Sequence, residues 1–216
     1  MKVLRNWSLL AITYASFFLW YTDLGGKLNS DEIENYLIKM QENRETSVFS
    51  SQERKESKEK GEMIKRFMKE DSGRQFFMVN NIDMSDSPPN VEGARPGEDA
   101  DQLMGRYMEH MYLELFKRAS HPVFAGNTVL QAVDLVGIEN AEEWDTAALI
   151  RYKSRRAFME IVSNPKMSEK HDFKVAALDK TIAYPVETVL YLSDPRLLLA
   201  FILIIFGLIL QLRSRE

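Results

Sequence analysis

Cysteine is missing from this sequence and histidine is scarce. None of the 216 residues is cysteine, which excludes disulfides, thiolate catalysis and cysteine-ligated metals. The three histidines, His110, His121 and His171, form no HExxH or HxH pair, so the sequence indicates no metal site. A P-loop, a GxGxxG loop and a GxSxG elbow are also missing. The sequence therefore specifies no reaction, and it leaves the catalytic residues and any cofactor unknown.

An excess of positive charge is missing as well. The chain has 28 Lys and Arg against 32 Asp and Glu, with a formal net charge of -4 at pH 7. A mildly acidic protein has no general electric field that attracts nucleic acid, so such a partner would need a local basic patch. One short stretch that could supply a patch is RYKSRR, residues 151–156.

Long apolar runs, in contrast, lie near both ends of the chain. The longer run, LLLAFILIIFGLILQL, covers residues 197–212. Ser193 or Asp194 can cap a helix there, and Pro195 suits its first turn. At about 1.5 Å per residue, such a helix is about as long as the bilayer core is thick. We predict a transmembrane helix within residues 193–216; the buried helix of a soluble protein is the alternative, but it is rarely so uniformly apolar.

The shorter run, WSLLAITYASFFLWY, covers residues 7–21. It is typical of either a signal peptide or an N-terminal membrane anchor. A small-x-small cleavage site is missing, and Trp20 and Tyr21 are residue types that concentrate at membrane interfaces. We therefore favour an uncleaved anchor, with a signal segment as the alternative, over residues 1–22.

Positive residues lie outside both runs. Lys2 and Arg5 precede the first, and Arg213 and Arg215 follow the second. The positive-inside rule then predicts that both termini are cytoplasmic and that residues 23–194 lie on the other side. This pattern is typical of a bacterial inner-membrane protein whose central domain is extracytoplasmic, with the lipid bilayer as its first partner.

Residues 23–72 carry helix signals. Asn29 and Glu32 have the spacing of a capping box. A second helix is expected to start at Ser50, and its first part, QERKESKEKGE, has no apolar face. These two segments predict a helical neck between the membrane and the following domain.

Residues 73–192 alternate between strand and helix patterns. The expected strands are residues 75–84, 121–130, 144–153 and 181–192. The expected helices are residues 101–118 and a second one capped by Ser154, which breaks or restarts at Asn164-Pro165; residues 85–100 form a long loop. The order β-α-β-β-α-β predicts an α+β domain with the ferredoxin-like arrangement. Pro185 indicates a sheet edge or a bulge in the last strand.

The predicted strands have two apolar faces. In the first strand, Phe76 and Met78 point one way, and Phe77 and Val79 point the other. Helices cover only one face of such a sheet, so the second face also needs cover. A second copy of the sheet could supply it in a face-to-face dimer. Packing of the neck or membrane segments is the alternative.

Four stretches resemble a known superfamily. MVNNIDM, HPVFAGNTV, WDTAALIRYKSRRAFMEIVSNPKM and KVAALDKTIAYPVE resemble an uncharacterised branch of the dimeric α/β-barrel superfamily over about residues 73–190. The resemblance implies a homodimer whose two sheets enclose a barrel with room for a small-molecule ligand. It implies no particular chemistry, because the superfamily includes monooxygenases, isomerases and haem-degrading enzymes.

Two amides interrupt the apolar first strand. Asn80 and Asn81 follow Phe-Phe-Met-Val, so one of them must point to each face. A buried amide must be hydrogen-bonded, so we expect one of the two either to contact a ligand or to pin a turn; we favour the structural role. Antiparallel pairing would bring the two amides near residues 144–146 and Arg151 near the opposite end of the first strand.

The stretch ALIRYKSRRAF has an electrostatic oddity. Ser154 is a good N-cap, yet Arg155 and Arg156 occupy the first helical turn, where cations oppose the helix dipole. A bound anion would reverse that penalty. Carboxylates of the chain, such as Asp145 or Glu187, could do the same, and plain solvent exposure is the commonest outcome.

The leading interpretation is a membrane-anchored protein whose extracytoplasmic dimeric domain is a ligand-binding or interaction module. The alternative is a membrane-tethered enzyme, monooxygenase- or isomerase-like, that acts on a small organic molecule in the barrel cavity. RNA-recognition domains share the strand order, but the third strand has aliphatic residues where stacking aromatics are needed, so no nucleic-acid partner is expected. The candidate ligand-binding residues are Asn80, Asn81, Arg151, Tyr152, Ser154, Arg155 and Arg156.

Overall fold

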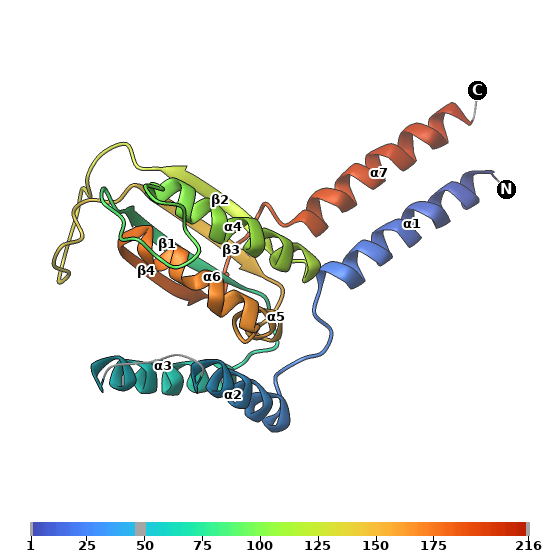
Figure 1. Ribbon diagram of the computed structural model, residues 1–216. Coiled ribbons are helices and arrows are strands. Elements are labelled where there is room, and N and C mark those ends of the chain that lie inside the picture. Colours follow the sequence, from blue (N-terminus) through green and yellow to red (C-terminus); the bar gives the residue numbers. More distant parts are fainter. Residues whose placement is uncertain (1, 46–50, 215–216) are drawn as a thin grey trace. The chain divides into compact units, whose positions relative to one another are not determined.

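The computed structural model describes residues 2–45 and 51–214, and these form two compact units. One unit is Gly25–Glu187, and the other combines Met1–Leu24 with Thr188–Glu216. Figure 1 shows the elements of both units.

The larger unit contains a four-stranded antiparallel sheet with the order β2-β3-β1-β4. The strands are β1 (Phe76–Met84), β2 (His121–Asn127), β3 (Thr146–Tyr152) and β4 (Leu178–Val186). The helices between them are α4 (Ala100–Lys117), α5 (Arg155–Val162) and α6 (Pro165–Ala176). The predicted α+β class and β-α-β-β-α-β order are therefore confirmed.

All four predicted strands differ from the observed ones at their ends, two of them by three residues or more. β2 ends at Asn127 instead of residue 130, because Asn127 pairs with Thr146, the first residue of β3. β4 covers Leu178–Val186 instead of residues 181–192. Val186 pairs with Phe77, near the start of β1, so the ladder has no partner for the residues that follow. The sheet order makes β4 an edge strand, as Pro185 predicted.

Helices α4, α5 and α6 supply the cover for one face of the sheet (Figure 1). Phe76 and Tyr152, paired across β1 and β3, stack at 5.2 Å between ring centroids. Phe158 of α5 meets both rings edge-on. Aromatic packing thus fixes the helix layer on the sheet.

The predicted restart of the helix at Asn164 is confirmed, because the Asn164 side chain accepts a hydrogen bond from the Lys166 backbone N–H at 3.1 Å.

The opposite face of the sheet has an apolar row that crosses all four strands. The row consists of Phe124, Leu149, Val79 and Tyr184, which are neighbours in the strand register. The Phe124 side chain is 52% exposed and that of Tyr184 is 47% exposed. One face of the sheet is therefore covered by helices, and the other presents apolar side chains to solvent.

Helices α2 (Ser30–Glu45) and α3 (Ser51–Lys69) belong to the same unit as the sheet. Their apolar residues pack on α5 through a second cluster, whose buried members are Leu28, Tyr36, Met68 and Met159. The capping box of α2 is confirmed: Glu32 N–H donates to Asn29 Oδ1, and Asn29 N–H donates to Glu32 Oε2, both at 2.9 Å. The predicted helix start at Ser50 lies outside the described residues. The described parts of this segment thus pack on the sheet domain, and their role as a neck between membrane and domain stays a prediction.

The smaller unit contains α1 (Lys2–Tyr21) and α7 (Pro195–Arg213), which lie side by side (Figure 1). Asp194 caps α7, with Pro195 in its first turn, as predicted. Trp7 of α1 contacts α7, where its Nε1 donates to Gln211 Oε1 at 3.2 Å. A Cβ atom at Gly207 would lie only 2.6 Å from the Trp7 ring, so glycine is needed for this close contact.

In the described part of the chain, one helix is long and apolar enough to cross a membrane, and it is Pro195–Arg213. Most of its apolar residues are exposed, and only Gly207 is buried. Two spans were predicted; α1 is a helix, but it does not meet the same criterion of length and hydropathy.

Candidate functional site

The basic stretch after β3 forms a polar network at the start of α5. Ser154 is buried and caps this helix, since its Oγ accepts a hydrogen bond from the Ala157 N–H at 3.2 Å. The cap fixes the direction in which the next two side chains leave the helix. Arg155 and Arg156 then reach different elements of the same unit.

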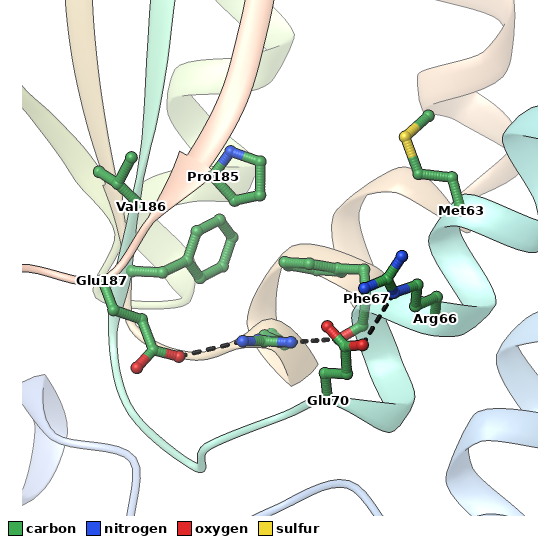
Figure 2. Close-up of a pocket in the computed structure, with 9 residues that line it drawn as sticks. Met63, Arg66, Phe67, Glu70, Pro185, Val186 and Glu187 are labelled. Atoms are coloured by element: carbon green, nitrogen blue, oxygen red, sulfur yellow. Dashed lines mark hydrogen bonds and ion pairs between the residues drawn. The ribbon is translucent and has the colours of Figure 1, made fainter.

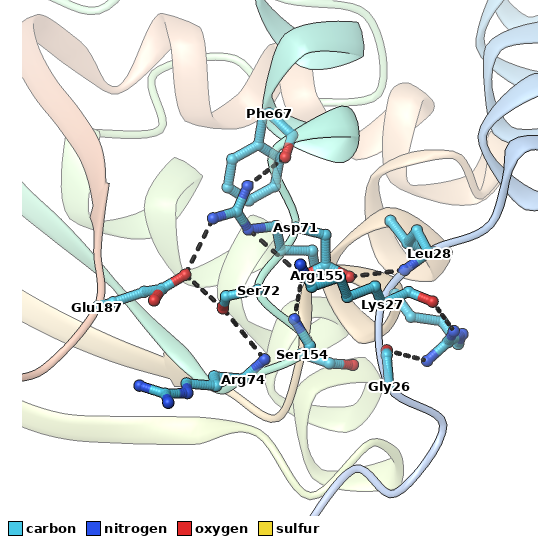
Figure 3. A network of polar contacts seen from close by, with 12 residues as sticks. Gly26, Lys27, Leu28, Phe67, Asp71, Ser72, Arg74, Ser154, Arg155 and Glu187 are labelled. Atoms are coloured by element: carbon cyan, nitrogen blue, oxygen red, sulfur yellow. Dashed lines mark hydrogen bonds and ion pairs between the residues drawn. The ribbon is translucent and has the colours of Figure 1, made fainter.

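Arg155 joins the end of α3 to the end of β4 (Figure 3). It donates from Nη1 to the backbone carbonyl of Phe67 and from Nη2 to Glu187 Oε1, the latter at 3.0 Å. Its Nε lies 3.6 Å from Asp71 Oδ1, within ion-pair range but too far for a good hydrogen bond. The guanidinium group also lies over the Phe67 ring, 4.6 Å from the centroid.

Arg156 contacts the start of α2. It forms a two-pronged ion pair with Glu32, with Nε–Oε1 and Nη2–Oε2 distances of 2.8 and 3.2 Å. Its guanidinium also approaches the carbonyls of Gly26 and Lys27 at 3.4 and 3.5 Å. Because Glu32 closes the capping box as well, one carboxylate connects the start of α2 to α5.

Asp71 is the buried carboxylate that sequence analysis missed. Its Oδ2 accepts the Leu28 N–H at 2.8 Å, and its Oδ1 accepts the Gly73 N–H at 3.0 Å. The second contact is an Asx-turn, for which Asp-Ser-Gly at residues 71–73 is a recognisable signal. Gly73 has φ +74°, and a Cβ there would lie 3.0 Å from the backbone of Gly26, so this turn needs glycine.

The cations at the start of α5 are thus neutralised by the chain's own carboxylates. Of the two carboxylates proposed from the sequence, Glu187 contacts Arg155, whereas Asp145 accepts the backbone N–H of Met84 at 2.7 Å. Hydrogen bonds from Ser72 Oγ and then from Arg155 hold the pKa of the Glu187 carboxyl below its usual range. A ligand-binding role for the two arginines stays a prediction.

A pocket of about 380 Å³ lies beside this network, between α3 and the end of β4 (Figure 2). Its lining residues are Met63, Arg66, Phe67, Glu70, Phe76, Arg155, Pro185, Val186 and Glu187. Two arginines face two glutamates there, and Arg66 pairs with Glu70 at 2.8 Å. The pocket therefore combines apolar walls with charged groups that balance one another.

The other four candidate residues lie in the sheet, on two different faces. Asn80 and Tyr152 point to the helix-covered face; Asn80 is buried and donates from Nδ2 to the Met78 carbonyl at 3.0 Å. Burial raises the pKa of the Tyr152 hydroxyl. Arg151 and Asn81 point to the opposite face, four residues apart in register, or about 13 Å at a strand's usual rise.

Arg151 is fully buried. Its Nε donates to Gln75 Oε1 at 2.8 Å and its Nη1 to the Ala119 carbonyl at 2.6 Å. The predicted register is close to the observed one: Arg151 is opposite Phe77 near the start of β1, while Asn81 pairs with Ala147, one residue beyond the predicted range 144–146. The structure thus separates the seven candidates into the α5 corner, the covered face and the open face.

Among residues 2–45 and 51–214, no group of three or more His, Asp or Glu is placed to hold a metal ion. No protein-family model matches the chain, and no curated protein matches its sequence.

Several solved structures resemble the fold. One is a protein of unknown function from Rhodopseudomonas palustris, with 19% identity and a TM-score of 0.49 over 60% of this chain and 94% of the other. Its methylated form gives 18% identity and a TM-score of 0.51, covering 62% of this chain and 93% of the other. A dimeric protein of unknown function and ferredoxin-like fold from Bacteroides fragilis gives 9% identity, a TM-score of 0.32, and coverage of 53% and 96%.

At these identities the likeness extends to the fold alone. Together with the sheet order and the single helix layer, it defines the larger unit as an α+β domain of the ferredoxin-like class. The fold by itself carries no activity.

Proposed function

We propose that the chain is a membrane-anchored interaction module that forms a homodimer through the open face of its sheet. The observation that carries this proposal is the apolar row Phe124, Leu149, Val79 and Tyr184. Half-exposed aromatic residues on the two outer strands of this face leave apolar area in contact with water, and a second copy would remove it. Two stacked sheets would then enclose a barrel, in agreement with the resemblance described above.

The C-terminal helix supports the membrane anchor. A soluble protein would bury an apolar helix of this length, whereas most residues of Pro195–Arg213 are exposed or half-exposed. The contact of Trp7 with Gly207 supports insertion of both helices as a packed pair, because small residues at close helix crossings are typical of membrane proteins. In this proposal both termini are cytoplasmic, residues 23–194 are extracytoplasmic, and the membrane is the bacterial inner membrane.

The positions of the polar residues favour binding over catalysis. Asn80 points to the helix layer, so it cannot line a cavity between two stacked sheets. Arg151 and Asn81 lie on the face that would line this cavity. Arg151 is fully buried by contacts within its own protomer, so Asn81 is the candidate that could contact a small-molecule ligand there.

The dimer is tested by comparing Phe124→Glu with Leu113→Glu. Both side chains are about equally exposed, 52% and 53%, but Phe124 lies in the apolar row and Leu113 on α4. In full-length protein in detergent, Phe124→Glu should halve the measured mass, because a charge buried between two sheets costs several kcal/mol. Leu113→Glu should leave the mass unchanged; equal behaviour of the two variants would overturn the proposed interface.

The topology is tested independently of the dimer. A reporter that is active only in the cytoplasm should be active when it is fused after Glu216, and a reporter that is active only outside the cytoplasm should not. Activity of an extracytoplasmic reporter at the same position would refute the orientation, whatever the oligomeric state.

A further inference from the structure

The connection between β2 and β3 exposes an unusual number of aliphatic side chains. Five of them are between 54% and 99% exposed, namely Val129, Leu130, Val133, Val136 and Ile138. Single exposed aliphatic residues are common on protein surfaces, but a contiguous group marks an interaction site. We call residues 128–145 the β2–β3 loop.

Hydrogen bonds across its base hold this loop in shape. Thr128 N–H donates to the Asp145 carbonyl at 2.8 Å, and Ala132 N–H donates to the Glu142 carbonyl at 2.7 Å. The Trp144 indole N–H donates to the Ala141 carbonyl at 2.8 Å, and Ala141 is buried. The base of the loop is thus fixed, which lowers the entropic cost of binding a partner there.

The charge of the loop is strongly one-sided. It contains five acidic residues and no Lys or Arg, whereas the whole chain has a formal net charge of only -4. The acidic residues are Asp134, Glu139, Glu142, Glu143 and Asp145. Such a surface is repelled by anionic lipid headgroups and by a second copy of the same loop. It attracts a surface that carries positive charge.

A pocket at the base of the loop also combines apolar and acidic side chains. It has a volume of about 340 Å³ and is lined by Asp83, Thr128, Leu130, Gln131, Glu143, Trp144 and Asp145. Nearby, Lys180 already places its Nζ 5.2 Å from the centre of the Trp144 ring and 3.4 Å from Asp83 Oδ2. In this internal contact a cation lies within cation–π range of the Trp144 ring and pairs with a neighbouring carboxylate.

We propose that the β2–β3 loop docks a partner protein through a segment in which Lys or Arg alternates with aliphatic residues. The aliphatic side chains of the partner cover Val133 and Val136, and a basic side chain enters the pocket beside Trp144. Charge complementarity selects the partner and steers it to the loop, while apolar burial supplies most of the affinity.

The test uses full-length protein in nanodiscs of zwitterionic lipid and a fluorescent peptide of alternating Lys and Leu, followed by fluorescence anisotropy. Peptides with Lys replaced by Glu, or with Leu replaced by Ser, are the matched probes, and empty nanodiscs give the background. The Lys/Leu peptide should bind at least roughly tenfold more tightly than either probe, because it alone supplies both charge and apolar area. Equal binding of the three peptides, or no binding above background, would overturn the proposal.

Variants then locate the site. Val133→Ser with Val136→Ser should weaken binding about tenfold, whereas Val175→Ser, an exposed valine on α6, should not change it. Glu142→Gln with Glu143→Gln should weaken binding several-fold and reduce its dependence on salt. If the Val175 variant has the larger effect, the peptide binds elsewhere and the proposal fails.

The same system tests whether a second copy of the chain, instead of a basic partner, binds to the β2–β3 loop. The chain has no cysteine, so Val136→Cys carries a photo-crosslinker at one defined position. Crosslinks should form to the Lys/Leu peptide when it is present. Efficient crosslinking between two copies of the chain, unaffected by peptide, would overturn the proposed docking of a basic partner. It would not contradict the dimer formed through the open face of the sheet.

Discussion

Replacing Arg155 by methionine should destabilise the larger unit. The change keeps an apolar stem but removes the bond to the Phe67 carbonyl, the stacking on the Phe67 ring and the ion pair with buried Asp71. Removal of one partner of a buried pair typically costs about 3–5 kcal/mol. Asp71 keeps two backbone N–H donors, from Leu28 and Gly73. We therefore expect a loss of about 2–3 kcal/mol in the free energy of unfolding.

Arg66→Met is the matched control for this measurement. Arg66 lines the same pocket, but its side chain and that of Glu70 are 78% and 60% exposed. Exposed pairs on a helix contribute at most about 0.5 kcal/mol. Thermal unfolding of full-length protein in detergent should show the melting temperature of Arg155→Met lowered by roughly 5–10 °C, with little change for Arg66→Met.

A double-mutant cycle assigns the effect to the network. Asp71→Asn in the Arg155→Met background should cost clearly less than Asp71→Asn in the parent chain, because the two residues interact. Equal melting temperatures for the Arg155 and Arg66 variants would refute the view that this network holds α3 and β4 to α5.

Two further predictions concern the end of β4 and the helical pair. Because the folded pKa of Glu187 is lowered, its contribution to stability should be present above the unfolded pKa and lost as the pH falls through the folded value; Glu187→Gln should make the melting temperature less dependent on pH in this acidic range. Gly207→Leu should force α1 from α7, because even a Cβ at this position would overlap the Trp7 ring. In a variant with Trp20 and Trp144 replaced by phenylalanine, Trp7 emission should then change, and an unchanged spectrum would contradict the helix contact.

Local signals in the sequence predicted the elements and their order. The capping residues Asn29, Ser154, Asn164 and Asp194 satisfy backbone N–H groups close by in the chain, so a short window contains the information. Strand-like apolar runs likewise identified all four strands. Strand ends were less accurate, because a strand ends where its neighbour stops pairing, and that neighbour can be a hundred residues away.

Long-range contacts explain what the sequence left open. The sequence shows that Arg155 and Arg156 oppose the dipole of α5. It does not show whether a bound anion, carboxylates of the chain or solvent compensates their charge. Two of their partners, Asp71 and Glu32, lie in the segment between the first apolar run and the first strand. No local pattern connects that segment to α5; the contact depends on how α2 and α3 pack on the sheet domain.

We propose that a second copy of the chain covers the open face of the sheet. The mass of the full-length protein in detergent, corrected for bound detergent, tests this dimer. We expect a particle of twice the 25.0 kDa chain mass. A homogeneous particle of a single chain, with the apolar row of Phe124 and Tyr184 still accessible to solvent, would contradict it.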